Sequence, residues 1–400
     1  MDPKAGAEDY DAPVTATDNG RLTRLTTDNG FFMSFNSFLG NPAAVQTIRE
    51  MLRADRLPGA LLFTGPEGVG KKTLALTLAQ AAVCERLKDD ACGECGRCRR
   101  AAEMIAAAGE DLARRREMKE SGRRVEGLVY FDLQLIAPIT RYILSEQIRV
   151  LRQVAYTRPF ELPRRFFIID QAQDIHWQAV DLLLKVMEEP PETTTFVLVC
   201  PNAGELRSTI RSRCQRVAFS PVDEELVLRL LEQRGAIPKA QQRLVARLSG
   251  GSVGRALEFD LPACLARREL WLEFFQSLSG GLGPRARTPD WGQLFDSTRK
   301  LTADRDHFEE MLSTGSELLR DLLLVLEGGE GAPVAHLDIV PRLKVWASAL
   351  GFQGIVALKE GLDEAHRLQI RNVNQQLGFD SLAIAMVSRG RLNAPRAGRP

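Results

Sequence analysis

The 400-residue sequence lacks three features that would each indicate a class of protein. Its formal net charge is only +1, so the chain as a whole has no charge excess that would attract nucleic acid. No apolar run approaches the roughly 20 residues that cross a bilayer. The first residues are acidic, not basic and then apolar as in a secretory signal. We therefore expect a cytoplasmic protein, in which any contact with DNA is local or depends on partners.

What the sequence does have is an alternation of apolar runs and helical patterns, typical of an α/β protein. Continuously apolar runs predict three buried strands, at 59–65, 165–170 and 194–200. Amphipathic patterns predict the helices between and after them, at 72–84, 145–155 and 178–189. Strands that alternate with helices predict a three-layer parallel sheet. After Pro221 the pattern is helical throughout.

Composition and pattern predict the domain boundaries. We expect a disordered leader at 1–32, an α/β domain at 33–221, a small helical unit at 222–262, a larger one at 263–388 and a basic tail at 389–400. The charged stretch 105–127 interrupts the α/β pattern. It predicts a solvated helix or loop inserted on the surface, and a patch that binds DNA or a partner is the alternative.

A glycine-rich loop follows the first predicted strand and opens the first predicted helix. Its sequence, Gly65-Pro-Glu-Gly68-Val-Gly70-Lys71, is that of a P-loop, in which backbone N–H groups and a lysine converge on phosphates. The strand–loop–helix context disfavours the alternative, a chance glycine-rich turn. A competent P-loop continues with Ser or Thr, whose hydroxyl binds magnesium. Here Lys72 takes that place, and Thr73 lies about 100° further around the helix.

The second predicted strand ends in Asp170, a residue suited to orienting magnesium, and continues with Gln171. ATPases with this arrangement normally have Glu after the Asp, where it polarises the attacking water. Gln171 cannot accept the proton, which removes roughly 10²–10⁴ in rate. We therefore expect a lost magnesium site and no ATP hydrolysis by the isolated chain. Whether ATP or ADP still binds stays open.

Four of the seven cysteines crowd into one short segment, with seven, two and two intervening residues: Cys84, Cys92, Cys95 and Cys98. Two overlapping C-x-x-C turns place three thiolates around one point, and the first cysteine closes a tetrahedron. No histidine lies nearby, so we expect a structural Cys₄ zinc site in a reducing compartment, with a redox role as the alternative. The other cysteines are expected to be ordinary buried thiols: Cys200, Cys214 and Cys264.

A pair of arginines follows the third predicted strand, in Thr209-Ile-Arg211-Ser-Arg213-Cys214. We interpret Arg213 as an arginine finger, which in trans stabilises charge on a transferring phosphoryl group and is worth about 10³–10⁵ in rate. Arg211 is the rival assignment. A basic helix end with surface salt bridges is the alternative without catalysis.

Taken together, these motifs resemble the clamp-loader branch of the AAA+ proteins over about 36–260. The segments that carry the resemblance are GPEGVGKKTLA, the Cys₄ knuckle, FFIIDQAQDI, LLLKVMEEPP, STIRSRC and GSVGRAL. The resemblance implies an AAA+ P-loop domain with a zinc-knuckle insert, a helical lid domain at 222–262 and an all-α collar domain at 263–388. It also implies two further residues of the degenerate nucleotide site, Asn202 as a sensor and Arg255 in the lid.

Within that branch the missing hydroxyl and glutamate separate this chain from the gamma/tau-type ATPase, and it resembles the stationary member whose arginine completes a neighbour's site. The resemblance implies partners in a hetero-pentamer of the DNA polymerase III holoenzyme: gamma/tau-type ATPase subunits, a delta-type clamp-opening subunit, the sliding clamp and primed DNA. The alternatives are a competent ATPase that holds magnesium with Asp170 and Thr73, a small-molecule phosphotransferase, and a scaffold whose arginines take no part in catalysis.

Overall fold

The structure, a computed structural model, describes residues 26–27, 30–31, 34–120, 132–235, 237–279, 290–304, 307–328, 331–370 and 374–392. The chain divides into two compact units, Met1–Ser220 and Pro221–Pro400. This boundary lies where the sequence pattern changes from strands and helices to helices alone. Of the predicted leader, the short antiparallel strands β1 (Thr26–Thr27) and β2 (Gly30–Phe31) are described, and residues 1–25 lie outside the described residues, as do 393–400 of the predicted tail.

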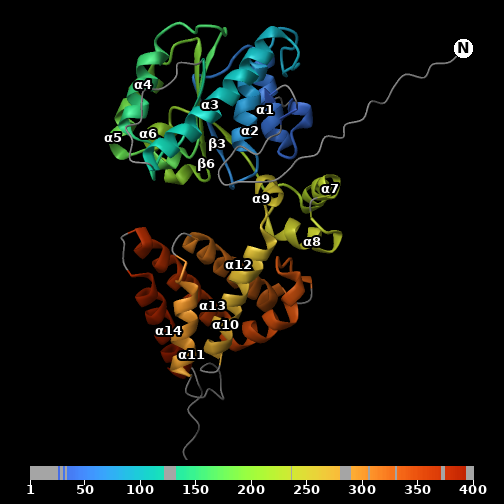
Figure 1. Cartoon of the computed structure of the whole chain (residues 1–400), viewed down its shortest axis with the longest axis vertical. Helices are drawn as coiled ribbons and strands as arrows, with labels where there is room; N and C mark the ends of the chain where they lie inside the picture. Colours follow the sequence, from blue (N-terminus) through green and yellow to red (C-terminus); the bar gives the residue numbers. More distant parts are fainter. Residues whose placement is uncertain are drawn as a thin grey trace, which may run out of the picture. The chain divides into compact units, whose positions relative to one another are not determined.

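The first unit contains a five-stranded, wholly parallel sheet with β3 and β6 near its centre (Figure 1). Its strands, in spatial order, are β4 (Leu133–Ile136), β5 (Arg165–Ile169), β6 (Thr194–Cys200), β3 (Ala60–Thr64) and β7 (Gln215–Ala218). The three predicted strands are confirmed as β3, β5 and β6, in each of which every residue is buried.

Helices cover both faces of this sheet, which confirms the three layers. The helices of the unit are α1 (Pro42–Arg53), α2 (Lys71–Ala81), α3 (Gly96–Glu120), α4 (Ser145–Ala155), α5 (Trp177–Glu188) and the short α6 (Ser208–Arg211). Because side chains alternate along a strand, Leu61 and Phe63 enter the core beneath α1, α2 and α3, while Leu62 enters the core beneath α4 and α5.

Helix α3 changes the interpretation of the charged stretch 105–127. Residues 105–120 continue a helix that begins at Gly96, and its apolar side buries Ile105, Ala108 and Leu112 in the core. As far as residue 120, the stretch is therefore part of a core helix and not a surface insert, with most of its charges on the solvent side and Arg115 buried. Residues 121–127 lie outside the described residues.

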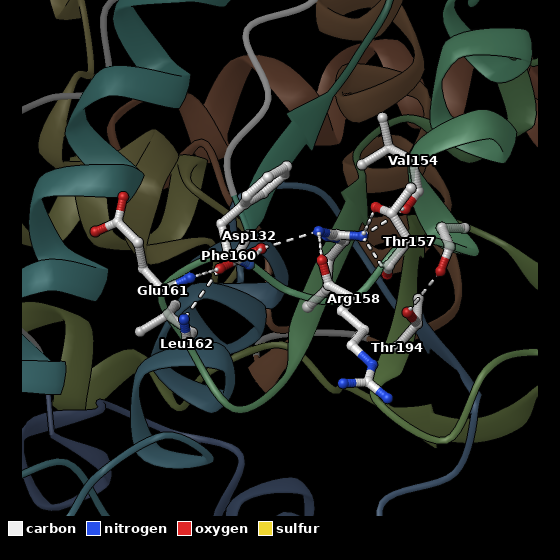
Figure 2. A network of polar contacts seen from close by, with 10 residues as sticks. Asp132, Val154, Thr157, Arg158, Phe160, Glu161, Leu162 and Thr194 are labelled. Atoms are coloured by element: carbon white, nitrogen blue, oxygen red, sulfur yellow. Dashed lines mark hydrogen bonds and ion pairs between the residues drawn. The ribbon is translucent and has the colours of Figure 1, made fainter.

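A buried ion pair joins the starts of β4 and β5 (Figure 2). Asp132 and Arg165 are both fully buried, with Oδ1 and Nη2 3.1 Å apart. The Asp132 carboxylate also accepts three backbone N–H bonds, from Phe160, Glu161 and Leu162. Arg165 donates to the backbone carbonyls of 154, 157 and 158. Together they fix the loop between α4 and β5 from both sides.

The described part of the second unit consists of helices. They are α7 (Glu224–Arg234), α8 (Lys239–Leu248), α9 (Val253–Leu257), α10 (Leu261–Ser279), α11 (Trp291–Leu301), α12 (Phe308–Gly328), α13 (Val340–Ile370) and α14 (Gln375–Leu392). One apolar cluster gathers α7 to α9 with the start of α10, and a second gathers α10 to α14. The division into lid and collar domains remains a prediction. No helix among the described residues has the length and apolarity to span a membrane.

Candidate nucleotide site, metal centre and arginine

The P-loop geometry depends on two glycines whose backbones no larger residue could match. Gly65 has a φ of 147°, and a Cβ there would lie 2.3 Å from the carbonyl oxygen of Phe219. Gly70 caps α2 with a φ of 92°, and a Cβ there would lie 2.8 Å from the ring of Phe38. The loop therefore turns tightly between the end of β3 and the N-terminus of α2, where backbone N–H groups favour an anion.

Lys71 is buried inside this loop. Its ammonium donates to the carbonyl oxygens of Gly65 and Pro66, both at 2.6 Å. Burial lowers the pKa of Lys71, and the negative charges of Glu67 and Asp170 oppose that shift. None of the carboxylates that the structure describes pairs directly with Lys71, so this buried cation is favourably placed to gain a phosphate.

Lys72 and Asp170 form an ion pair that the sequence did not predict. The Lys72 ammonium lies 3.1 Å from Asp170 Oδ2, with the two side chains 29% and 21% exposed. These are the positions whose oxygens would hold magnesium in a competent site. Here one of them supplies a cation, so the donor set does not fit Mg²⁺, which requires oxygen ligands. Thr73 lies half-buried one position along α2.

Gln171 occupies an unusual backbone position directly after Asp170. Its φ of 53° lies in the left-handed region, which costs a non-glycine residue roughly 1–2 kcal/mol. Its side chain helps to line a cavity of about 530 Å³, together with Arg116, Lys119, Pro138, Ile139 and Thr140. The structure thus places an amide where a hydrolytic site needs a carboxylate.

The two sensor candidates both have partners within their own unit. The Asn202 side chain accepts the backbone N–H of Gly204 at 2.8 Å and caps a short 3₁₀ turn. Arg255, on α9, pairs with Glu317 at 2.9 Å and lies over the ring of Phe259. Their roles as nucleotide sensors remain predictions.

The candidate finger Arg213 lies between α6 and β7, with 33% of its side chain exposed. Its guanidinium donates to Glu188 Oε1 at 2.7 Å and to the carbonyl of Thr209 at 2.8 Å. Glu188, at the end of α5, was missed because nothing in the sequence indicates a pair 25 residues apart. Arg211 is exposed and has no ion-pair partner among the described residues.

The four clustered cysteines converge as predicted. Their sulfur atoms all lie within 4.8 Å of one another, and those of Cys92 and Cys98 are 4.0 Å apart. A tetrahedral ion with bonds of about 2.3 Å would place sulfurs about 3.8 Å apart. Backbone N–H groups point at three of the sulfurs, from Leu87 to Cys84, from Cys95 to Cys92 and from Cys98 to Cys95. Such bonds stabilise thiolates, so these cysteines can bind a metal ion.

The remaining cysteines behave as the sequence predicts. Cys200 and Cys264 are buried and Cys214 is half-buried. Burial raises the pKa of Cys200 to about 11 and that of Cys214 to about 12. Both therefore remain thiols at neutral pH.

Comparison with known proteins identifies a family to which part of the chain is similar. Residues 40–223 match the model of the family described as "DNA polymerase III, delta subunit". DNA polymerase III subunit delta' of Bacillus subtilis is 29% identical over 220 residues, which are 55% of this chain and 59% of that protein. Over residues 40–223 the chain is similar to the clamp-loader family of DNA polymerase III subunits.

A second type of DNA polymerase III subunit is also similar to this chain. Subunit tau of Bacillus subtilis is 26% identical over 195 residues, which are 48% of this chain and 30% of that protein. The chain thus covers less than two thirds of the length of either relative. A solved DNA polymerase III gamma subunit-related protein of Thermotoga maritima is 15% identical, with a TM-score of 0.38, over 87% of this chain and 100% of that one. Both subunit types occur among the relatives, so the choice between them depends on the chemistry of the site.

Proposed function

We propose that this chain is a delta-prime-type clamp-loader subunit of the DNA polymerase III holoenzyme. It hydrolyses no ATP itself and supplies Arg213 in trans to a neighbouring gamma/tau-type ATPase while a sliding clamp is loaded on primed DNA. The observation that carries the proposal is the Lys72–Asp170 ion pair. It places an ammonium where a clamp-loader ATPase would hold magnesium.

Two independent defects argue against hydrolysis in this chain's own site. Magnesium neutralises the developing charge on the transferred phosphoryl group, and Lys72 removes one of its ligands. A glutamate would polarise the water, and Gln171 cannot. A P-loop that keeps Lys71 but lacks the magnesium-binding hydroxyl and the glutamate retains its fold and loses ATP hydrolysis.

Arg213 is suited to act on a neighbour because its guanidinium reaches the surface. Its contact with Glu188 is half-exposed, so the pair contributes little to stability and is readily exchanged. A phosphate oxygen from a neighbouring subunit would replace the Glu188 carboxylate with a stronger bidentate partner. The arginine would then stabilise negative charge that exists only during phosphoryl transfer.

The cysteine cluster fits a structural zinc site. Four sulfur ligands close the coordination sphere and leave no position for a substrate. The site would fix the segment between α2 and α3, which otherwise contains little regular structure. Structural zinc of this kind contributes of order 10 kcal/mol to folding.

The runner-up is a competent gamma/tau-type ATPase, which the similarity to subunit tau favours. ATP hydrolysis by the purified chain separates the two, measured alone and in a mixture with its gamma/tau-type partner. We expect no turnover by the chain alone and turnover in the mixture. Steady turnover by the isolated chain that Lys71→Ala abolishes would establish the runner-up.

A further inference from the structure

The P-loop of this chain carries its own cation. Lys72 lies in the first turn of α2. Its Nζ is 3.1 Å from Oδ2 of Asp170, at the end of β5. Within the residues that the structure describes, Asp170 is its one ion-pair partner. Both side chains remain partly open to solvent, at 29% and 21%, so a ligand can reach the pair.

The charge of the site differs from that of an ordinary P-loop before magnesium binds. There, one lysine faces one aspartate, and the metal supplies the positive excess that attracts the phosphate chain. Here Lys72 adds a second cation to Lys71 beside Asp170, and the negative charge of the exposed Glu67 also acts on Lys71. The phosphate chain would meet this additional cation at the N-terminus of α2 without a metal.

The geometry of an ammonium allows it to serve both groups at once. Lys72 has three N–H donors, and Asp170 needs only one of them. The remaining donors are available to phosphate oxygens, while Asp170 holds the side chain beside the loop. Lys71, which donates to two loop carbonyls, would exchange them for phosphate oxygens.

We propose that this P-loop binds the phosphate chain of a nucleoside di- or triphosphate without a divalent metal, with Lys72 as the resident counter-cation and Asp170 as the residue that positions it. This binding does not depend on Arg213 or on any partner subunit. The site would then bind a nucleotide but take no part in the magnesium-dependent hydrolysis that the neighbouring subunits perform.

The test is the affinity of the full-length chain for a fluorescent ADP, titrated in magnesium and again in EDTA. We expect the same dissociation constant in both. A dissociation constant that falls about tenfold or more when magnesium is added would overturn the proposal. The absence of binding under both conditions would overturn it as well.

Lys72→Thr supplies the sharper comparison because it restores the missing hydroxyl. We expect its affinity in EDTA to fall about tenfold, the loss of one charge-assisted contact, and to recover on addition of magnesium. Lys72→Arg is the matched comparison, which keeps the cation and should therefore bind in EDTA more tightly than Lys72→Thr. Thermal melting confirms that each variant is folded. If Lys72→Thr binds ADP in EDTA as tightly as the wild type, the proposed role of Lys72 is wrong. This result is independent of the rate of ATP hydrolysis by the assembled complex.

Discussion

Asp132 and Arg165 show how strongly a single residue pair can determine the local fold. Both side chains are fully buried, and the carboxylate accepts three backbone N–H bonds besides the guanidinium (Figure 2). Charged groups tolerate such burial only when they are paired and hydrogen-bonded. The pair therefore stabilises the α4–β5 loop as long as both members are present.

Asp132→Asn should lower the free energy of unfolding by about 3–5 kcal/mol, because it leaves Arg165 buried without a counter-charge. Urea unfolding followed by circular dichroism measures the change. Asp89→Asn is the control, because the Arg53–Asp89 pair is partly exposed to solvent and its loss should cost at most about 1 kcal/mol. Equal losses in the two variants would contradict this account of the buried pair.

The residues of the candidate site could be named from the sequence, but not their pairing. Glycines and lysines at fixed spacing predicted the loop, because a P-loop is formed by consecutive residues. The Lys72–Asp170 and Arg213–Glu188 pairs join residues far apart in the chain. They depend on which strands are neighbours and on the side-chain rotamers, and neither has a sequence signature.

At the scale of elements, burial decided which strands could be predicted. Strands β3, β5 and β6 are covered on both faces, so each is a continuous apolar run. Strand β7 lies at the sheet edge, and only one of its four residues is buried. Strand β4 includes the polar residue Gln134 among its four buried residues. Helix α3 was misread because its many charges masked an apolar stripe on its other side.

The cysteine knuckle gives a prediction about an element. The purified chain should contain one zinc per molecule, and Cys95→Ser should lose it together with part of the helical signal, because a bound metal would fix the segment that leads into α3. Metal analysis and circular dichroism provide the two measurements. Cys264→Ser is the control, since that buried thiol lies on α10 in the second unit. A metal content unchanged in Cys95→Ser would exclude the Cys₄ site.

At the scale of the whole molecule, each unit contains a buried carboxylate whose ionised form is stabilised by folding. Burial alone would raise the pKa of Asp132, but hydrogen bonds from the loop and Arg165 lower it. Burial likewise opposes ionisation of Asp321, and its bonds to His336 and to the backbone of Ala335 lower its pKa. Both groups bind fewer protons when folded than when unfolded, at pH values near their titration.

Both units should therefore lose stability in acid. The contribution of each carboxylate is complete above its unfolded pKa of about 3.9 and disappears as the pH falls through the lower folded value. Unfolding free energies measured from pH 6 downward should fall most steeply below about pH 4. Asp321→Asn should flatten part of that dependence. If the unfolding free energy of Asp321→Asn depends on pH as steeply as that of the wild type, Asp321 does not contribute to the loss of stability in acid.

The central claim is that Arg213 acts in trans at the ATP site of a neighbouring subunit and that the chain itself hydrolyses no ATP. The most direct measurement is DNA-stimulated ATP hydrolysis by the reconstituted clamp loader, containing wild type, Arg213→Ala or Arg211→Ala. We predict that Arg213→Ala abolishes most of the activity, because a finger in trans is worth about 10³–10⁵ at its site, while gel filtration shows an intact complex. Arg211→Ala should retain the wild-type rate. Hydrolysis at the wild-type rate with Arg213→Ala would contradict the account.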